Sequence, residues 1–284
     1  MYDADPASQS DIAADTMQRV NGVARVRFGV SGGDTRLADL YQSGSAKIRL
    51  PKVYGEPRTA VLINTAGGLT GGDRLTFDVA VGDAGHAIVT SQTAERAYRS
   101  TGGSAEVTGR FAVGAGATLE WLPQETILFD ASRLTRSMEA DLGEDARLMM
   151  LETVILGRTA MGEKIHSVFF RDRWRIRRSG RLVFADDIRL DGTPDKFLAG
   201  PATGNGALAF ATLVDCAPDA EDREPLARAS MDEAASVSTK SAVSSWNGLL
   251  VARFVSHDSR DLRNTLIRFL TRYRAAGLPR VWHC

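Results

Sequence analysis

Apolar residues recur at nearly every second position between residues 20 and 189, and glycines separate the runs. This alternation is typical of strands that bury one face. In one run Leu75, Phe77, Val79 and Val81 share a face, and a turn follows. The pattern predicts strands at 23–30, 59–64, 75–81, 86–92, 106–113, 118–122, 147–155, 165–177, 182–190 and 207–214. So many closely spaced strands predict a mainly β fold of stacked or coiled sheets.

Two helices are predicted after residue 220, a short one over 226–235 and a clearer one over 259–276. Asp258 or Ser259 can cap the second helix, and Gly277 with Pro279 ends it. One of its faces is apolar and holds Leu262, Leu266, Phe269, Leu270 and Tyr273. The other face is basic and holds Arg260, Arg263, Arg268, Arg272 and Arg274. Such a basic face is either simply solvated or a surface for a protein partner.

Charge and hydropathy exclude several classes of function. Lys plus Arg number 35 and Asp plus Glu number 35, so the net charge favours neither nucleic acid nor an anionic membrane. No apolar run approaches the roughly 20 residues that a membrane helix needs. Residues 1–17 are polar and acidic, which predicts a flexible tail before one domain over 18–284, without a secretory signal. Cys216 and Cys284 form no CxxC motif, so we expect a soluble protein of the reducing cytoplasm.

The most unusual segment is the glycine-rich run from Asn64 to Asp73. A phosphate-binding loop would need a Gly-Lys-Ser/Thr sequence that opens a helix, whereas Asp73 precedes a predicted strand. A calcium-binding repeat would need several copies of the motif, which occurs once. We therefore expect the glycines to form tight turns with positive φ, and we keep Asp73 as a candidate functional carboxylate.

Two further carboxylates are candidates, Glu125 in the segment 119–129 and Glu163 in the predicted loop 157–163. Each has an ordinary alternative. An acid beside apolar strand residues is usually exposed or paired with an arginine, and a loop carboxylate is usually solvated. A carbohydrate-active β-helix enzyme would use two such carboxylates in a cleft, with Asp73 and either Glu125 or Glu163 as the pair.

Other catalytic or metal-binding chemistry is sparse. The histidines are scattered, and His283 with Cys284 offers only two donors for a metal at the chain end. Neither a nucleophile elbow nor a Ser/His/Asp order is present. The chain is therefore predicted not to be an enzyme.

Five segments form a specific combination: NTAGGLTGGD (64–73), TSQTAERAY (90–98), LEWLPQETILF (119–129), GRTAMGE (157–163) and LPRVW (278–282). In this order they resemble the UreD (UreH) family of urease accessory proteins. The resemblance covers most of the chain. One departure is Arg96, where the family often has a lysine.

The resemblance implies a β-helix-like stack of sheets with few helices, and a scaffold role in nickel insertion into apo-urease. The implied partners are a UreF-type accessory protein, a UreG-type GTPase and the apo-urease subunits. No tightly bound cofactor is implied, only nickel in transit along weak oxygen donors, since strong Cys/His sites would trap the ion. We assign Asp73, Glu163 and Glu125 to this nickel passage, and Arg263, Arg268 and Arg272 to partner binding, as predictions.

Overall fold

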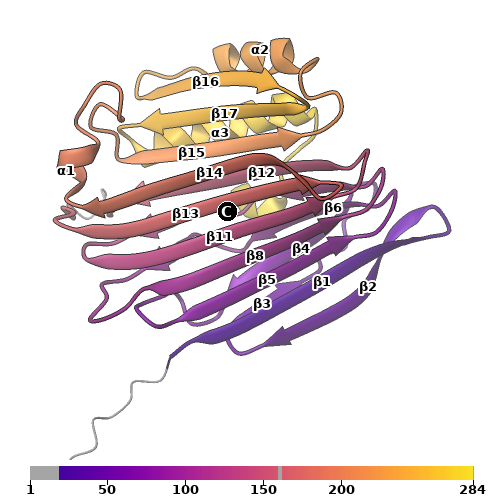
Figure 1. Ribbon diagram of the computed structural model, residues 1–284, viewed down its shortest axis with the longest axis horizontal. Coiled ribbons are helices and arrows are strands. Elements are labelled where there is room, and N and C mark those ends of the chain that lie inside the picture. The colour runs from indigo at the N-terminus through magenta and orange to yellow at the C-terminus, as the bar shows by residue number, and fades with distance from the viewer. Residues whose placement is uncertain (1–18, 159–161, 284) are drawn as a thin grey trace, which may run out of the picture.

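Two β-sheets lie face to face in the computed structural model, which describes residues 19–158 and 162–283 (Figure 1). The first sheet has seven strands, in the order β14 (Arg181–Gly192), β13 (Val168–Arg178), β11 (Ser132–Leu142), β8 (Ala105–Val113), β5 (Arg74–Val81), β1 (Asn21–Ser31) and β2 (Asp34–Ser43). The prediction of a mainly β, β-helix-like fold is confirmed.

The second sheet has ten strands. Eight follow the order β16 (Thr239–Trp246), β17 (Leu249–Ser256), β15 (Ala209–Cys216), β12 (Arg147–Leu156), β9 (Thr118–Trp121), β6 (His86–Ser91), β4 (Arg58–Asn64) and β3 (Ala46–Arg49). The short strands β7 (Glu95–Ala97) and β10 (Thr126–Leu128) pair with each other, and β10 also pairs with β12.

The chain winds between the two sheets in coils. β4 of the second sheet leads to β5 of the first, and β9 and β12 lead in the same way to β11 and β13. Neighbouring coils therefore pair in parallel, as in β11 with β8 and β13. Antiparallel strands close the ends of both sheets, for example β2 and β14 in the first.

Two apolar cores lie on opposite sides of the second sheet. The inner core fills the space between the sheets and includes Phe28, Leu134 and Phe170. The outer core lies under the helices α2 (Glu224–Ala234) and α3 (Ser259–Arg274) and includes Leu266 and Phe269. The apolar face predicted for the second helix is thus buried. Each such side chain contributes about 1.5–3 kcal/mol on burial.

Helix α3 begins as predicted, because the Asp258 side chain accepts a hydrogen bond from the Asp261 amide at 2.7 Å. It ends at Arg274, two residues before the predicted end, because Ala275 takes a left-handed conformation with φ 52°. Helix α2 agrees with the predicted 226–235 to within two residues. A short helix α1 (Pro194–Phe197) follows β14. The predicted tail, 1–17, lies outside the described residues.

Several strands were not predicted from the alternation, namely β2, β3, β7, β10, β11, β16 and β17. β2 is exposed along almost its whole length. Because neither of its faces is buried, its apolar residues need not recur at every second position. β11 does alternate, but a charged residue, Arg136, stands at one of its buried positions. In the part of the chain that the structure describes, no helix is both long and apolar enough to cross a bilayer.

Candidate functional site

A cavity of about 90 Å³ lies between the sheets where three of the five resemblance segments meet. Asn64 and Gly67 come from the first segment, residues 91 and 93–96 from the second, and Trp121 and Gln124 from the third. The lining extends from the exposed Arg96 to fully buried side chains. A volume of this size holds several water molecules where polar partners are present.

Glu95 places a carboxylate on the cavity wall, at the start of β7. Asn64 Nδ2 donates to both carboxylate oxygens at 3.2 Å, and the Arg96 amide donates to Oε1 at 3.0 Å. Burial raises the pKa of Glu95, and these hydrogen bonds offset only part of the rise. Asn64 is itself held by the Ala66 amide, so the glycine-rich turn positions the carboxylate.

A buried ionic cluster forms the inner end of the cavity. Arg136 binds Asp172 through two hydrogen bonds of 3.0 and 2.6 Å, and it also contacts Glu152. The Trp121 indole donates to Glu152 at 2.8 Å. Burial raises the pKa of Glu152 to about 7, although the charge of Arg136 opposes the rise. One guanidinium thus faces two carboxylates, so the cluster carries a net negative charge when both are ionised.

The glycine-rich segment forms tight turns, as expected, with positive φ at Gly67 and Gly72. Asp73 closes the second of these turns. One of its carboxylate oxygens accepts from the Thr70 amide and the other from the Val20 amide, both at 2.8 Å. Asp73 is buried and does not line the cavity. Its contacts fasten the turn to the start of β1.

Glu163 also binds backbone amides, those of Asp130 at 3.2 Å and Arg158 at 3.0 Å. The Arg158 guanidinium adds an ion pair at 3.0 Å. Burial raises the pKa of Glu163, but these hydrogen bonds outweigh it, and the pKa lies below its usual value. Residues 159–161 of the same segment lie outside the described residues. Glu163 therefore ties together two loops at the ends of strands.

Glu125 forms an ion pair with Arg263 at 2.6 Å, which attaches α3 to the second sheet. Arg263 also donates to Gln124 at 2.6 Å and to the Trp282 carbonyl at 2.8 Å. Asp73, Glu125 and Glu163 thus belong to three separate networks. The structure does not join them as one site, either for a metal ion or for a carboxylate pair.

The other two predicted partner-binding arginines also contact their own chain. Arg268 donates to the Ala234 carbonyl at 2.9 Å, and Arg272 forms an ion pair with Glu233. Both contacts link α3 to α2. The side chain of Arg272 remains 44% exposed, against 23% for Arg263.

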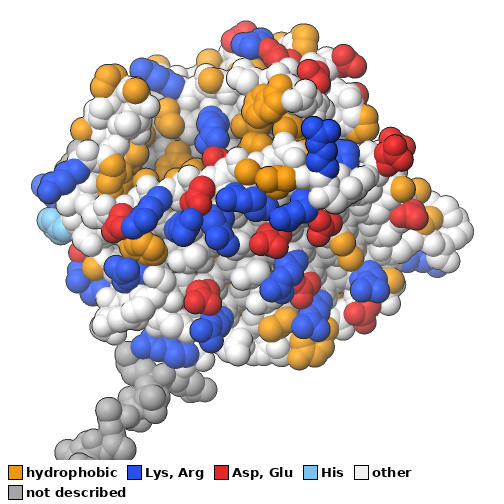
Figure 2. Space-filling view, viewed as in Figure 1, with side chains coloured by type: hydrophobic (Ala, Val, Ile, Leu, Met, Phe, Trp, Pro, Cys, Tyr) orange, Lys and Arg blue, Asp and Glu red, His pale blue; other side chains and the backbone are white. Residues whose placement is uncertain are grey.

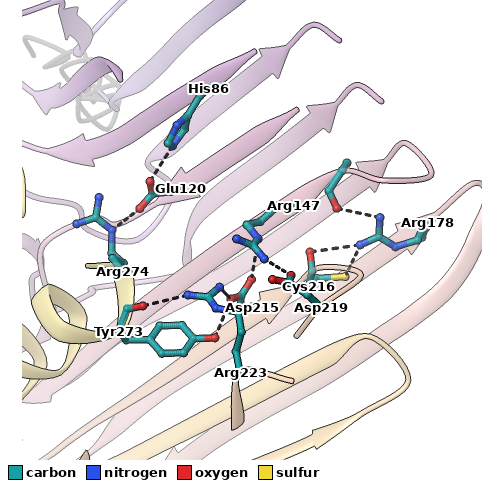
Figure 3. A network of polar contacts seen from close by, with 11 residues as sticks. His86, Glu120, Arg147, Arg178, Asp215, Cys216, Asp219, Arg223, Tyr273 and Arg274 are labelled. Carbon is teal, nitrogen blue, oxygen red and sulfur yellow. Dashed lines mark hydrogen bonds and ion pairs between the residues drawn. The ribbon is translucent and has the colours of Figure 1, made fainter. Parts of the chain in front are cut away.

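A further polar network holds the C-terminal half of α3 on the second sheet (Figure 3). Glu120 of β9 accepts from His86 at 2.8 Å and binds Arg274. Burial raises the pKa of Glu120, but His86 and Arg274 outweigh this and lower it. Tyr273 donates to the buried Asp215 at 2.8 Å. These contacts explain why so basic a helix face is compatible with close packing.

Sequence reasoning missed Glu95, Arg136 and Glu152. For Arg136 the sequence did hold a signal. It lies two positions from both Leu134 and Met138, so the alternation of this strand places a charged residue on the buried face. Among the described residues, no group of three or more His, Cys, Asp or Glu side chains is placed to hold a metal ion. His283 is exposed, and Cys284 lies outside the described part.

The fold and the cavity define a coiled β scaffold with paired charged groups in its interior. Its sequence matches the family model described as UreD urease accessory protein over residues 20–283. The chain belongs to this family. It is 46% identical over 273 residues to urease accessory protein UreD of Jannaschia sp., covering 96% of this chain and 98% of that protein. It is 45% identical over 272 residues to urease accessory protein UreD 1 of Methylobacterium radiotolerans, covering 95% and 94%.

Proposed function

We propose that the chain is a non-catalytic cytoplasmic scaffold for nickel insertion into apo-urease, and that Ni²⁺ in transit uses the cavity beside Glu95. The observation that carries the proposal is the convergence of three resemblance segments on this cavity, with a carboxylate on its wall. The wider assembly would contain a UreF-type protein, a UreG-type GTPase and the urease subunits.

The chemistry of the cavity suits a cation that must be released again. The Glu95 carboxylate is a hard oxygen donor, which binds Ni²⁺ more weakly than imidazole or thiolate. Inside the cavity, the cluster around Arg136 carries a net negative charge when Glu152 is ionised, and in that state it attracts a divalent cation. Asp73, Glu125 and Glu163 remain proposed oxygen donors for other parts of the route. Each would bind Ni²⁺ only after its present hydrogen bonds within the fold had opened.

Substitution of Glu95 tests the route. Glu95→Gln keeps the shape and the acceptor for the Arg96 amide but removes the charge. We expect the purified accessory complex to assemble with an unchanged Tm, while co-expressed urease contains less nickel and loses activity in proportion. Glu106→Gln is the matched control, since Glu106 lies on an exposed strand position paired with Arg74.

Normal nickel loading of urease by the Glu95→Gln protein would rule out this carboxylate as part of the route. Asp73→Ala gives the contrasting pattern. It leaves two backbone amides without acceptors, so we expect lower Tm and less soluble complex together, at a cost of about 1–3 kcal/mol. A drop in nickel content at an unchanged Tm would instead assign Asp73 to the passage.

A partner role for the α3 arginines is tested at Arg272, because its side chain is 44% exposed and its ion pair is with the exposed Glu233. We expect Arg272→Glu to weaken capture of a UreF-type protein without unfolding the chain. Arg263 and Arg268 are poorer test positions, since their guanidinium groups donate to backbone carbonyls of the fold.

A further inference from the structure

An apolar hollow of about 200 Å³ lies where the first sheet ends and the second continues. β14 is the last strand of the first sheet, whereas the second extends through β15, β17 and β16 (Figure 1). Part of the inner face of β17 is therefore left without a facing strand in the described structure. The hollow is lined by the half-buried or buried side chains of Ile188, Leu190, Leu198, Phe210 and Val255.

β14 forms one wall of this hollow and has a free edge. Within the described residues it pairs only with β13. Ile188 and Leu190 face the hollow, and Arg189 between them is exposed on the outer face of the sheet. A segment added beside β14 would consequently place alternate side chains in the hollow and on the outer face.

The outer face beside the hollow is basic. β13 presents four arginines at alternate positions, Arg171, Arg173, Arg175 and Arg177. Arg171 is paired with Asp187 at 2.8 Å, but the other three form no ion pair with any described residue. Glu139 and Asp141 lie opposite Arg175 and Arg177 in the neighbouring strand without pairing to them. Figure 2 shows this basic band over β13 and β14, directly below the hollow with its apolar lining.

We propose that the hollow and the arginines of β13 form a docking surface for an extended, acidic segment of a partner protein. The segment inserts an apolar side chain between Leu190 and Val255 and adds to the free edge of β14. Its outward carboxylates lie beside β14, about 10 Å or two strand spacings from the backbone of β13, a distance that the long side chains of Arg173 and Arg177 span. Apolar burial supplies affinity, and the charges supply register and association rate.

A protein segment fits better than nucleic acid or a membrane. The carboxylates of Asp187, Glu139 and Asp141 are interspersed among the arginines, and they would repel a continuous row of phosphates. A peptide can place its acids opposite the arginines alone. The apolar side chains of the hollow also offer no hydrogen-bond donors to phosphate groups. This surface is separate from the proposed nickel cavity, so either proposal can fail without the other.

The test uses the full chain and a labelled peptide that alternates Glu and Val around one central Phe. We expect saturable binding that weakens as salt increases, and no binding of the same peptide with Lys in place of Glu. Arg173→Gln with Arg177→Gln removes two charges and should lower the affinity about tenfold. Val255→Trp fills the hollow and should have a similar effect.

Arg27→Glu with Arg74→Glu is the control, because it reverses two exposed charges at the other end of the same sheet. The proposal is overturned if the control weakens binding as much as the test variants, or if the Lys peptide binds equally well. It is also overturned if duplex DNA or phosphatidylserine vesicles displace the peptide and bind more tightly to the same arginines. Self-association of the chain that Val255→Trp abolishes would instead assign the surface to a second copy.

Discussion

At the scale of single residues, the interior charges determine how stability depends on pH. The side chain of Glu152 is 4% exposed and has a pKa of about 7 in the fold, against an ordinary value of 4.5 for glutamate. Between these two values the folded chain keeps a proton that the unfolded chain has lost. The contribution of Glu152 to stability therefore falls as pH rises from about 4.5 to 7, because this group binds fewer protons in the unfolded state.

We predict that Glu152→Gln removes this part of the pH dependence. Glutamine keeps an acceptor oxygen for the Trp121 indole, while Asp172 still neutralises the Arg136 guanidinium. Thermal unfolding of both proteins at pH 5 and pH 7 measures the difference. The Tm of the variant should change less between these two pH values than that of the unaltered chain; an equal change would show that Glu152 is ionised throughout.

The same residues show what the sequence could predict about the site. Asp73, Glu125 and Glu163 stood out as polar residues in unusual segments, and each proved to be tightly bonded within the fold. The ionic cluster did not stand out, because Arg136 and Asp172 are 36 residues apart and meet only when successive coils align. Alternation within one strand reveals a buried face, whereas register between coils depends on the three-dimensional stack.

At the scale of elements, periodicity predicted well those strands with one buried face and the two longer helices. It failed for strands such as β2 at the edge of a sheet, where neither face is buried. The basic face of helix α3 was also harder to interpret from periodicity. A basic face at helical spacing was predicted to be solvated or to bind a partner, yet Arg263 and Arg274 pair with carboxylates of the second sheet. Helical spacing alone does not show what covers the polar face.

We predict that Arg263→Ala destabilises the fold by about 2–3 kcal/mol, because it leaves the buried Glu125 and the Trp282 carbonyl without their partner. Arg260→Ala is the matched control on the exposed side of the same helix and should change stability by less than about 0.5 kcal/mol. Urea unfolding followed by circular dichroism compares the two. Equal effects would mean that the Arg263 contacts contribute little.

At the scale of the whole molecule, the second sheet is shared by both cores. Its inner face packs against the first sheet and its outer face against α2 and α3, so neither core can open without exposing one face of the same strands. Both β12 and β15 contribute residues to both cores, for example Leu148 and Val214 to the inner one and Leu151 and Leu213 to the outer one. One domain over 18–284 remains a prediction, and the strands shared by both cores make it testable.

We therefore predict a single cooperative unfolding transition that a cavity in either core lowers as a whole. Leu134→Ala opens a cavity in the inner core and Leu266→Ala one in the outer core, and both side chains are fully buried. Each should cost about 2–5 kcal/mol. Calorimetry and tryptophan fluorescence, which reports on Trp121 within the inner core and Trp282 within the outer, should give the same Tm for each variant. Two transitions, of which Leu266→Ala shifts only one, would show instead that the helical layer unfolds separately from the stacked coils.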